Sequence, residues 1–506
     1  MLSWPSAVSL AFSQLLTSTD AGCVIHPYLM SFNSFDFYLF LAIALTGHAL
    51  LNGKAMQVWL CVMSYLCYGW GHPWWYVGLL FFSNVLDYVV SRRIDATDDP
   101  RQRKLWLACS VIGNLGVLTT FKYLGFIARS LNRLIPALTP LDLQLPVPDL
   151  SLPPGISFYT FQTLSYTIDV YRRQIKPERS LVKLGLFVSY FPTLVAGPIE
   201  RGTDLLGQLD QKRARTSEDV FLGVSRILWG LTKKIVFADW LGLYVAHVYG
   251  DAGRMAAGHL LLATYAFAFQ IYLDFSAYSD IAWGIGRLMG HRIIENFRWP
   301  YLARNISEFW RRWHISFSTW LRDYLYIPLG GSRRGHVRTV INVFIVMLLG
   351  GLWHGAEMKF ILWGLWIGLG LACFHAYTLC VPRDRDAAQP VRWRDAPAVL
   401  LTFHWICVSW VFFRAGSIGE ALMILRRIGS AWGPGAVTVP SEIVIRTVVF
   451  LSIVVLVHIF RGMGGRLLRW ERLRRPVAVG ILWGALIITM ALFYAPSQEP
   501  FIYFQF

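Results

Sequence analysis

Long apolar runs, separated by short basic or glycine- and proline-containing segments, recur along almost the whole chain. They lie near residues 37–51, 58–70, 74–90, 106–127, 156–170, 181–196, 220–241, 260–273, 340–353, 360–379, 398–413, 444–460 and 477–493. Runs of this kind form helices in a bilayer, although several are short for a hydrocarbon core about 30 Å thick. The pattern predicts an all-α polytopic membrane protein with roughly 11 to 13 membrane-embedded helices.

Composition agrees with this class. Hydrophobic residues make up 55% of the 506 and charged residues only 15%, whereas soluble domains carry about 25% charge. We expect one integral-membrane domain over residues 36–495, after a leader or interfacial segment at 1–35 and before a tail at 496–506. The leader lacks a basic start, so no cleaved signal peptide is expected. Six prolines between Leu134 and Pro154 predict an extended surface loop.

The formal net charge of +17 comes from basic clusters in short loops between the apolar runs. Such loops favour the cytoplasmic side and anionic lipid surfaces, which argues against a nucleic-acid-binding role. The seven cysteines mostly lie inside apolar runs and have no metal-ligand spacing. We interpret them as packing residues and expect no metal site.

Between Pro300 and Gly330, tryptophans and aliphatic residues alternate at helical spacing with arginines. This pattern predicts an amphipathic helix at the membrane surface. Asn305 followed by Glu308 offers a capping-box start. His314 ends the basic, Trp-rich block Trp310–His314 and is either a functional residue or an ordinary polar-face residue.

The strongest candidate is His354, which closes the apolar run that begins at Val343. An ionisable residue is costly in a membrane helix and by default marks a functional site. The nearby Gly350, Gly351 and Gly355 let a ligand or another backbone approach closely, or they serve helix packing with His354 as a hydrogen-bonded core residue.

Further polar residues interrupt other apolar runs. Asp274 and Tyr278 lie one helical turn apart, and Lys234 and Asp239 lie within another run. Asp and Lys residues on facing helices are expected to pair with one another. Asp274 is also a candidate for orienting or charge-stabilising a nearby imidazole.

The chain has no Gly-x-Ser-x-Gly elbow, Walker loop or Asp-His-His-Cys centre, which disfavours a serine hydrolase or an ATP-driven pump. It does resemble the membrane-bound O-acyltransferase (MBOAT) family, in its bacterial alginate O-acetyltransferase branch. The resemblance rests on blocks at 155–159, 196–199, 272–280, 295–297, 308–329, 347–356 and 410–415.

This resemblance implies a ring of tilted and re-entrant helices around a central tunnel. It also implies that His354 is catalytic and that His314 is a second functional position. With the basic, Trp-rich surroundings, it leads us to expect substrate binding by Asp274, Tyr278, Arg311, Trp313, Asn342 and Trp353. We expect acetyl-CoA as the acyl donor, with no bound cofactor.

The function implied is O-acetylation of an exported, alginate-like polysaccharide from a multi-pass protein of the bacterial inner membrane. A separate periplasmic acetyltransferase partner is expected to finish the transfer. D-alanyl transfer to a cell-envelope polymer is an alternative. Two other classes stay open: a transporter or flippase gated by buried charges, and a glycosyltransferase using Asp98 and Asp99.

Overall fold

The computed structural model describes residues 30–139, 144–210, 213, 215–381, 391–433, 435–464, 476–494 and 501–502. Within these residues the regular structure is entirely helical. Six segments are long and apolar enough to cross a membrane: Pro100–Leu138, Ala257–Leu288, His336–His354, Met358–Cys380, Trp393–Arg414 and Ser441–Gly462. The all-α polytopic class is therefore confirmed, while the total of 11 to 13 embedded helices and the domain limits stay predictions.

In chain order the elements are α2 (Phe35–Leu50), α3 (Gly53–Gly69), α4 (Trp75–Asp95), α5 (Pro100–Leu118), η1 (Thr119–Tyr123), α6 (Leu124–Leu138), α7 (Ile156–Tyr171), α8 (Leu181–Ser189), α9 (Gly202–Leu205), η2 (Leu206–Leu209), α10 (Ser217–Thr232), η3 (Lys233–Ala238), α11 (Asp239–Gly250), α12 (Ala257–Leu288), η4 (Pro300–Leu302), α13 (Ile306–Trp310), α14 (Ile315–Leu321), η5 (Arg322–Tyr326), α15 (His336–His354), α16 (Met358–Cys380), η6 (Trp393–Asp395), α17 (Ala396–Arg414), α18 (Ile418–Ser430), α19 (Ser441–Gly462) and α20 (Pro476–Leu492). The elements η1, η3 and η5 are π-helical turns, and each lies next to an α-helix.

Two predicted boundaries differ from the structure. The apolar run at 181–196 is helical only as α8, which ends at Ser189, shortly before Pro192, whose ring disfavours helical backbone angles at the preceding residue. The predicted loop from Leu134 begins later, since α6 continues through Pro136 to Leu138. Beyond it, the Asn132 side chain bonds the backbone N–H and carbonyl of Leu145, so the extended segment folds back against α6.

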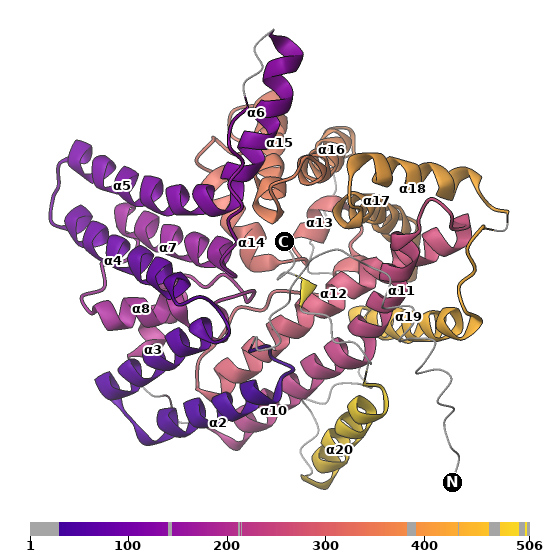
Figure 1. Cartoon of the computed structure of the whole chain (residues 1–506). Coiled ribbons are helices and arrows are strands. Elements are labelled where there is room, and N and C mark those ends of the chain that lie inside the picture. Colours follow the sequence, from indigo (N-terminus) through magenta and orange to yellow (C-terminus); the bar gives the residue numbers. More distant parts are fainter. Residues whose placement is uncertain are drawn as a thin grey trace.

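The 32-residue helix α12 crosses the centre of the helix assembly, with α10 and α11 beside it and the short α13 and α14 near its middle (Figure 1). Its buried carboxylates are neutralised by residues of α10 and η3. Asp274 lies 2.8 Å from the ammonium of Lys234. Asp280 contacts Lys233 at 2.6 Å and Arg226 at 2.7 Å. The predicted pairing of Asp and Lys between neighbouring helices is confirmed for these residues.

Helices α15 and α16 pack with their backbones in contact. A side chain at Gly351 would lie 2.2 Å from the carbonyl oxygen of Phe360, and one at Gly364 would lie 2.3 Å from that of Met347. Only glycine fits at such separations. The glycines near His354 were expected either to admit a ligand or to serve helix packing. For Gly351 the structure shows helix packing.

Candidate active site

His354 is the last residue of α15, and its side chain is 5% exposed. Its imidazole lies against aromatic rings of the two following helices, with centroids 4.9 Å from Trp363 of α16 and 5.3 Å from Phe413 of α17. The close packing of α15 on α16 positions this end of the helix. The residue that was singled out because it is ionisable within an apolar run is thus buried in an aromatic pocket.

The prediction of one amphipathic helix over residues 300–330 is wrong, because the chain breaks at His314. This residue has left-handed backbone angles, φ 43° and ψ 57°, and precedes α14. The break is stabilised by hydrogen bonds to an earlier segment: Ile315 N–H donates to the carbonyl of Asn296 at 3.0 Å, and Arg298 N–H donates to that of Arg312 at 2.9 Å. His314 is 0% exposed, so the polar-face interpretation is also wrong.

The structure brings the two histidines together around shared aromatic walls. The ring centroid of Phe317 lies 5.0 Å from His314 and 5.8 Å from His354. Trp353 contacts the same two imidazoles at 6.0 and 5.0 Å. Burial lowers the pKa of His314 well below its ordinary value. The His314 imidazole is therefore neutral at physiological pH and able to accept a proton.

Asn296 orients the ring of His314. Its side chain is 2% exposed, and its amide oxygen lies 3.3 Å from Nδ1 of His314. The same oxygen accepts hydrogen bonds from the backbone N–H and the hydroxyl of Ser316, both at 3.0 Å. Because a carbonyl oxygen only accepts, Nδ1 carries the proton and Nε2 is the basic nitrogen. The sequence motif at 295–297 marks this residue, but its role depends on a contact that no local pattern predicts.

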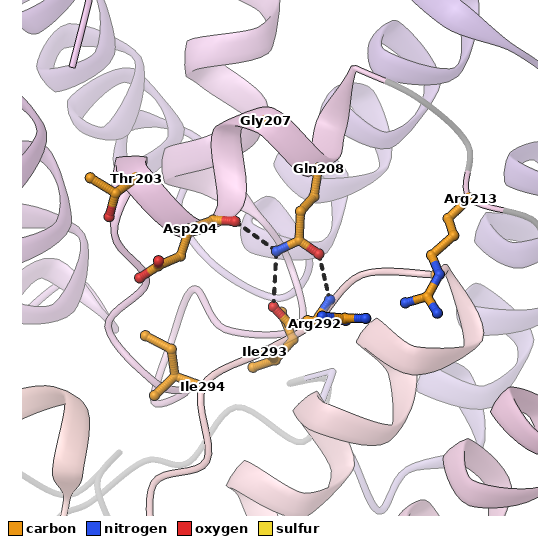
Figure 2. Close-up of a pocket in the computed structure, with 9 residues that line it drawn as sticks. Thr203, Asp204, Gly207, Gln208, Arg213, Arg292, Ile293 and Ile294 are labelled. Atoms are coloured by element: carbon orange, nitrogen blue, oxygen red, sulfur yellow. Dashed lines mark hydrogen bonds between the residues drawn. The ribbon is translucent and has the colours of Figure 1, made fainter.

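The loop that leads to Asn296 also forms one wall of a cleft of about 630 Å³ (Figure 2). Gln208 anchors this loop: its amide group donates to the carbonyl of Arg292 at 3.1 Å and accepts from the Arg292 N–H at 2.7 Å. Two residues further along the cleft wall, Ile294 N–H donates to the buried carboxyl of Glu200 at 3.0 Å. Side chains of the 200–210 segment therefore fix the backbone that supports His314.

A larger cleft has a volume of about 930 Å³, and we call it the arginine cleft. It is formed by residues of α13, α14, η5, α15 and α16, together with Gly462 at the end of α19. Its polar lining includes Arg298, Ser307, Glu308, Arg311, Arg312, Ser318, Thr319 and Arg322. The helix that begins directly after His314 and the helix that ends at His354 thus also line a basic cleft.

Within the arginine cleft, Arg311 differs from its neighbours. Arg298, Arg312 and Arg322 each form an ion pair with a carboxylate at 2.7 to 3.0 Å. The guanidinium of Arg311 donates to the hydroxyl of Ser307 at 3.1 Å, and no carboxylate lies within ion-pair distance of it among the described residues. Arg311 is therefore the arginine best placed to meet a ligand phosphate.

Glu308 organises the charged wall of this cleft. Its carboxylate receives hydrogen bonds from Arg304 at 2.9 and 3.0 Å and from Arg312 at 2.7 Å. Burial alone would raise the pKa of Glu308, but these hydrogen bonds and the arginine charges lower it below the ordinary value. Asn305 accepts from the Glu308 N–H at 2.8 Å, so the predicted start of the helix at Asn305 is confirmed.

Three other predicted substrate-binding residues lie near this site but contact protein groups. Trp313 is buried against Phe297 and Trp410, with ring centroids 5.2 and 5.1 Å away. Asn342 on α15 donates to the carbonyl of Gly331 at 3.0 Å and holds the loop after η5. Trp353 packs against the imidazoles of both histidines. Their contribution to substrate binding stays a prediction.

Asp274 and Tyr278, both on α12, contact other parts of the chain. Besides Lys234, the carboxylate of Asp274 accepts the backbone N–H of Ile502 at 2.6 Å, whereas the orienting contact to His314 comes from Asn296. Tyr278 stacks on Phe32 with centroids 4.3 Å apart and meets the edge of Phe501 at 5.3 Å. Residues from the predicted leader and from the predicted tail therefore both pack on α12; most of these two segments lies outside the described residues.

Comparison with known proteins shows the family of this chain. The model of the MBOAT, membrane-bound O-acyltransferase family matches residues 155–413, which include both histidines, Asn296 and the arginine cleft apart from Gly462. The chain belongs to the membrane-bound O-acyltransferase family. It is therefore a membrane O-acyltransferase, and the transporter and glycosyltransferase alternatives fall away.

Curated relatives cover most of the chain. A probable alginate O-acetylase of Pseudomonas putida is 36% identical and covers 93% of this chain and 98% of its own length. A peptidoglycan O-acetyltransferase of Helicobacter pylori is 32% identical, with 80% of each chain covered. A teichoic acid D-alanyltransferase of Bacillus subtilis is 25% identical and covers 76% of this chain and 97% of its own.

The acidic pair considered for a glycosyltransferase has ordinary structural roles. Asp98 forms an ion pair with the exposed Arg173. Asp99 caps α5, accepting the N–H of Arg101 at 3.0 Å. Both lie in the charged loop before α5, away from the two histidines in the sequence.

Proposed function

We propose that this protein takes acetyl groups from cytoplasmic acetyl-CoA and passes them across the bacterial inner membrane for O-acetylation of an exported polysaccharide. The observation that carries the proposal is the pair of buried imidazoles around Phe317 and Trp353. The helices α14 and α15, which hold these residues, also line the arginine cleft. Relatives named for O-acetyl transfer, at 32% identity or more, support acetyl as the acyl group.

The arginine cleft suits the phosphates of coenzyme A. Among the described residues Arg311 has no carboxylate partner, and apart from its bond to Ser307 it offers further N–H donors in a fork that matches phosphate geometry. Arg333 and Arg334 lie in the exposed loop between η5 and α15. Because basic loops are retained in the cytoplasm, we assign this face to the cytoplasmic side, where acetyl-CoA is available.

In the simplest chemical route, His354 acts as a general base. Its neutral imidazole removes the proton from the acceptor hydroxyl, whose oxygen then attacks the thioester carbonyl carbon. The carbon–sulfur bond breaks, and the departing thiolate takes the proton from the imidazolium, giving the acetyl ester and free coenzyme A. His314, with Nε2 as its basic nitrogen, is placed to orient a reactant or to share the proton transfer.

In a second route, the acetyl group is first transferred to His354 itself. The imidazole of His354 attacks the thioester, coenzyme A leaves with a proton, and the resulting acetyl-imidazole is then attacked by the acceptor hydroxyl. This route predicts a burst of coenzyme A release before steady-state turnover. The base route predicts no burst, so rapid mixing of the protein with acetyl-CoA separates the two.

The test of the proposed function is turnover of labelled acetyl-CoA by the purified protein in liposomes, with cell-envelope extract added as the source of acceptor. We expect acetyl-CoA to be consumed and labelled acetate esters to appear on envelope polymer. Failure with acetyl-CoA but transfer from a carrier-protein thioester of D-alanine would favour the D-alanyl alternative. Failure with every acyl donor would refute the proposal.

Arg311→Ala is expected to raise KM for acetyl-CoA by roughly tenfold, because a charge-assisted hydrogen bond contributes about 1.5–3 kcal/mol. The value of kcat should change little, since the phosphates lie far from the reacting carbonyl along the donor molecule. The measurement is steady-state kinetics over a range of acetyl-CoA concentrations.

Two controls make this prediction specific. Acetyl-pantetheine carries the thioester without the nucleotide phosphates, so Arg311→Ala should leave its KM unchanged. Arg333→Ala removes an exposed arginine outside the arginine cleft and should behave like the wild type with both donors. An equal rise in KM for the two donors would show that Arg311 does not meet the phosphates.

We further propose a separate periplasmic acetyltransferase that finishes the transfer onto the polymer. The described chain is a set of packed helices with no separate soluble unit, and a long sugar chain cannot reach a buried histidine. We expect such a protein to co-purify from native membranes in mild detergent, equally with the wild type and with His354→Gln. Polymer acetylation by this chain alone in liposomes would contradict the prediction.

A further inference from the structure

The C-terminal end of α15, which carries His354, is buried and has its carbonyl groups fully bonded. The last four carbonyls of an α-helix have no partner within the helix and need one elsewhere. The carbonyl of Gly351 accepts from the Gly355 N–H at 3.4 Å. The carbonyl of Leu352 accepts from the hydroxyl of Tyr123 at 2.8 Å. Tyr123 belongs to η1, far earlier in the chain.

Lys122, the residue before Tyr123, supplies the other two bonds. Its ammonium nitrogen lies 2.5 Å from the carbonyl oxygen of Trp353 and 3.3 Å from that of His354. It also donates to the hydroxyl of Ser157 on α7 at 3.2 Å. An ammonium group has three donors, so these three acceptors use all of them. Two consecutive residues thus complete the helix end at His354.

Lys122 differs from an ordinary surface lysine in its surroundings. It lies in the long apolar segment formed by α5, η1 and α6, where a charged residue is costly and needs a local purpose. It sits in a π-helical turn, a feature that is frequent at functional sites. Its positive charge faces the negative end of the α15 dipole, which is the favourable orientation.

We propose that Lys122 and Tyr123 are positioning residues for His354, holding the end of α15 so that the imidazole keeps one orientation between Phe317 and Trp363. The inference rests on the proposed function, because it assigns the two residues to the reaction of His354. Lys122 touches the backbone of the reactive residue and Tyr123 that of Leu352, two residues earlier, and neither lines the arginine cleft.

Steady-state kinetics of a graded series at Lys122 test this inference. Lys122→Met removes donors and charge, and we expect kcat for acetyl-CoA to fall by about 10- to 100-fold, as for other misplacements of a catalytic group. KM should stay within about twofold, because the donor site is untouched. Lys122→Gln keeps donors without charge and should be intermediate, while Lys122→Arg keeps both and should restore most of kcat.

Two further variants keep the result interpretable. Lys104→Met removes an exposed lysine of α5 and should match the wild type. Tyr123→Phe removes a single hydroxyl and should lower kcat several-fold at unchanged KM, which tests the inference even if Lys122→Met fails to fold. Wild-type kcat per folded molecule in Tyr123→Phe and Lys122→Gln would overturn the inference. Absence of turnover in the wild type would instead refute the proposed function.

Discussion

His354→Ala is expected to leave a folded, membrane-inserted protein whose acetyl transfer is reduced by at least about 10²-fold, the usual effect of losing general base catalysis. The side chain is buried among aromatic rings of three helices, so removal also leaves a small cavity. Acetyl-CoA turnover and thermal stability must therefore be measured on the same preparations.

The variant that decides the role of His354 is His354→Gln. Glutamine retains similar size and hydrogen bonding but has no basic nitrogen, so we expect it to be nearly as inactive as alanine. If His354 were only a hydrogen-bonded core residue, glutamine would restore turnover and alanine would chiefly lower stability. His314→Ala should be comparably severe if His314 shares the proton transfer and milder if it only orients a reactant.

Lys234→Met is expected to cause the largest loss of stability, about 3–5 kcal/mol, because it leaves buried carboxylates without a counter-charge. The Lys234 side chain is 1% exposed and lies 2.8 Å from both Asp239 and Asp274. Thermal unfolding of the purified protein in detergent, together with the amount recovered from membranes, measures the effect.

The matched control for this prediction is Lys54→Met, which removes an exposed lysine at the start of α3. It should unfold at the wild-type temperature. Adding Asp239→Asn and Asp274→Asn to Lys234→Met should recover part of the loss, since the buried charges are then removed together. A Lys234→Met protein as stable as the wild type would show that the ion pairs contribute nothing net.

Much of this architecture follows from local sequence. Apolar runs predict helices such as α15 and α16. Asp and Lys residues within such runs predict ion pairs between neighbouring helices, because a lone charge is costly in an apolar interior. His354 stands out for the same reason. The helices and the ion pairs can be predicted because membrane-embedded segments are mostly apolar, so that an ionisable residue within one is easily recognised in the sequence.

The details of the site depend on contacts between distant residues. The left-handed turn at His314 is stabilised by Asn296, and the end of α15 is held by Lys122, more than two hundred residues earlier. The amphipathic pattern over 300–330 predicts one helix, whereas the structure has a break at His314. The pattern could not predict this break, because local periodicity carries no information about the distant segment that stabilises it. The structure pairs the carboxylate of Asp274 with Lys234, and the predicted roles of Asp274 and Tyr278 in substrate binding stay predictions.

The ion pairs between η3 and α12 have a consequence for how the protein enters the membrane during synthesis. Alone at a helix centre, a lysine or an aspartate disfavours insertion by about 2.5–3.5 kcal/mol. Lys233 and Lys234 emerge from the ribosome well before Asp280 and Asp274, with which they pair. Lys234 can first pair with Asp239 of its own segment, whereas the carboxylate that pairs with Lys233 arrives only with α12. We therefore expect α10 and η3 to settle in the membrane together with α12 and not before it.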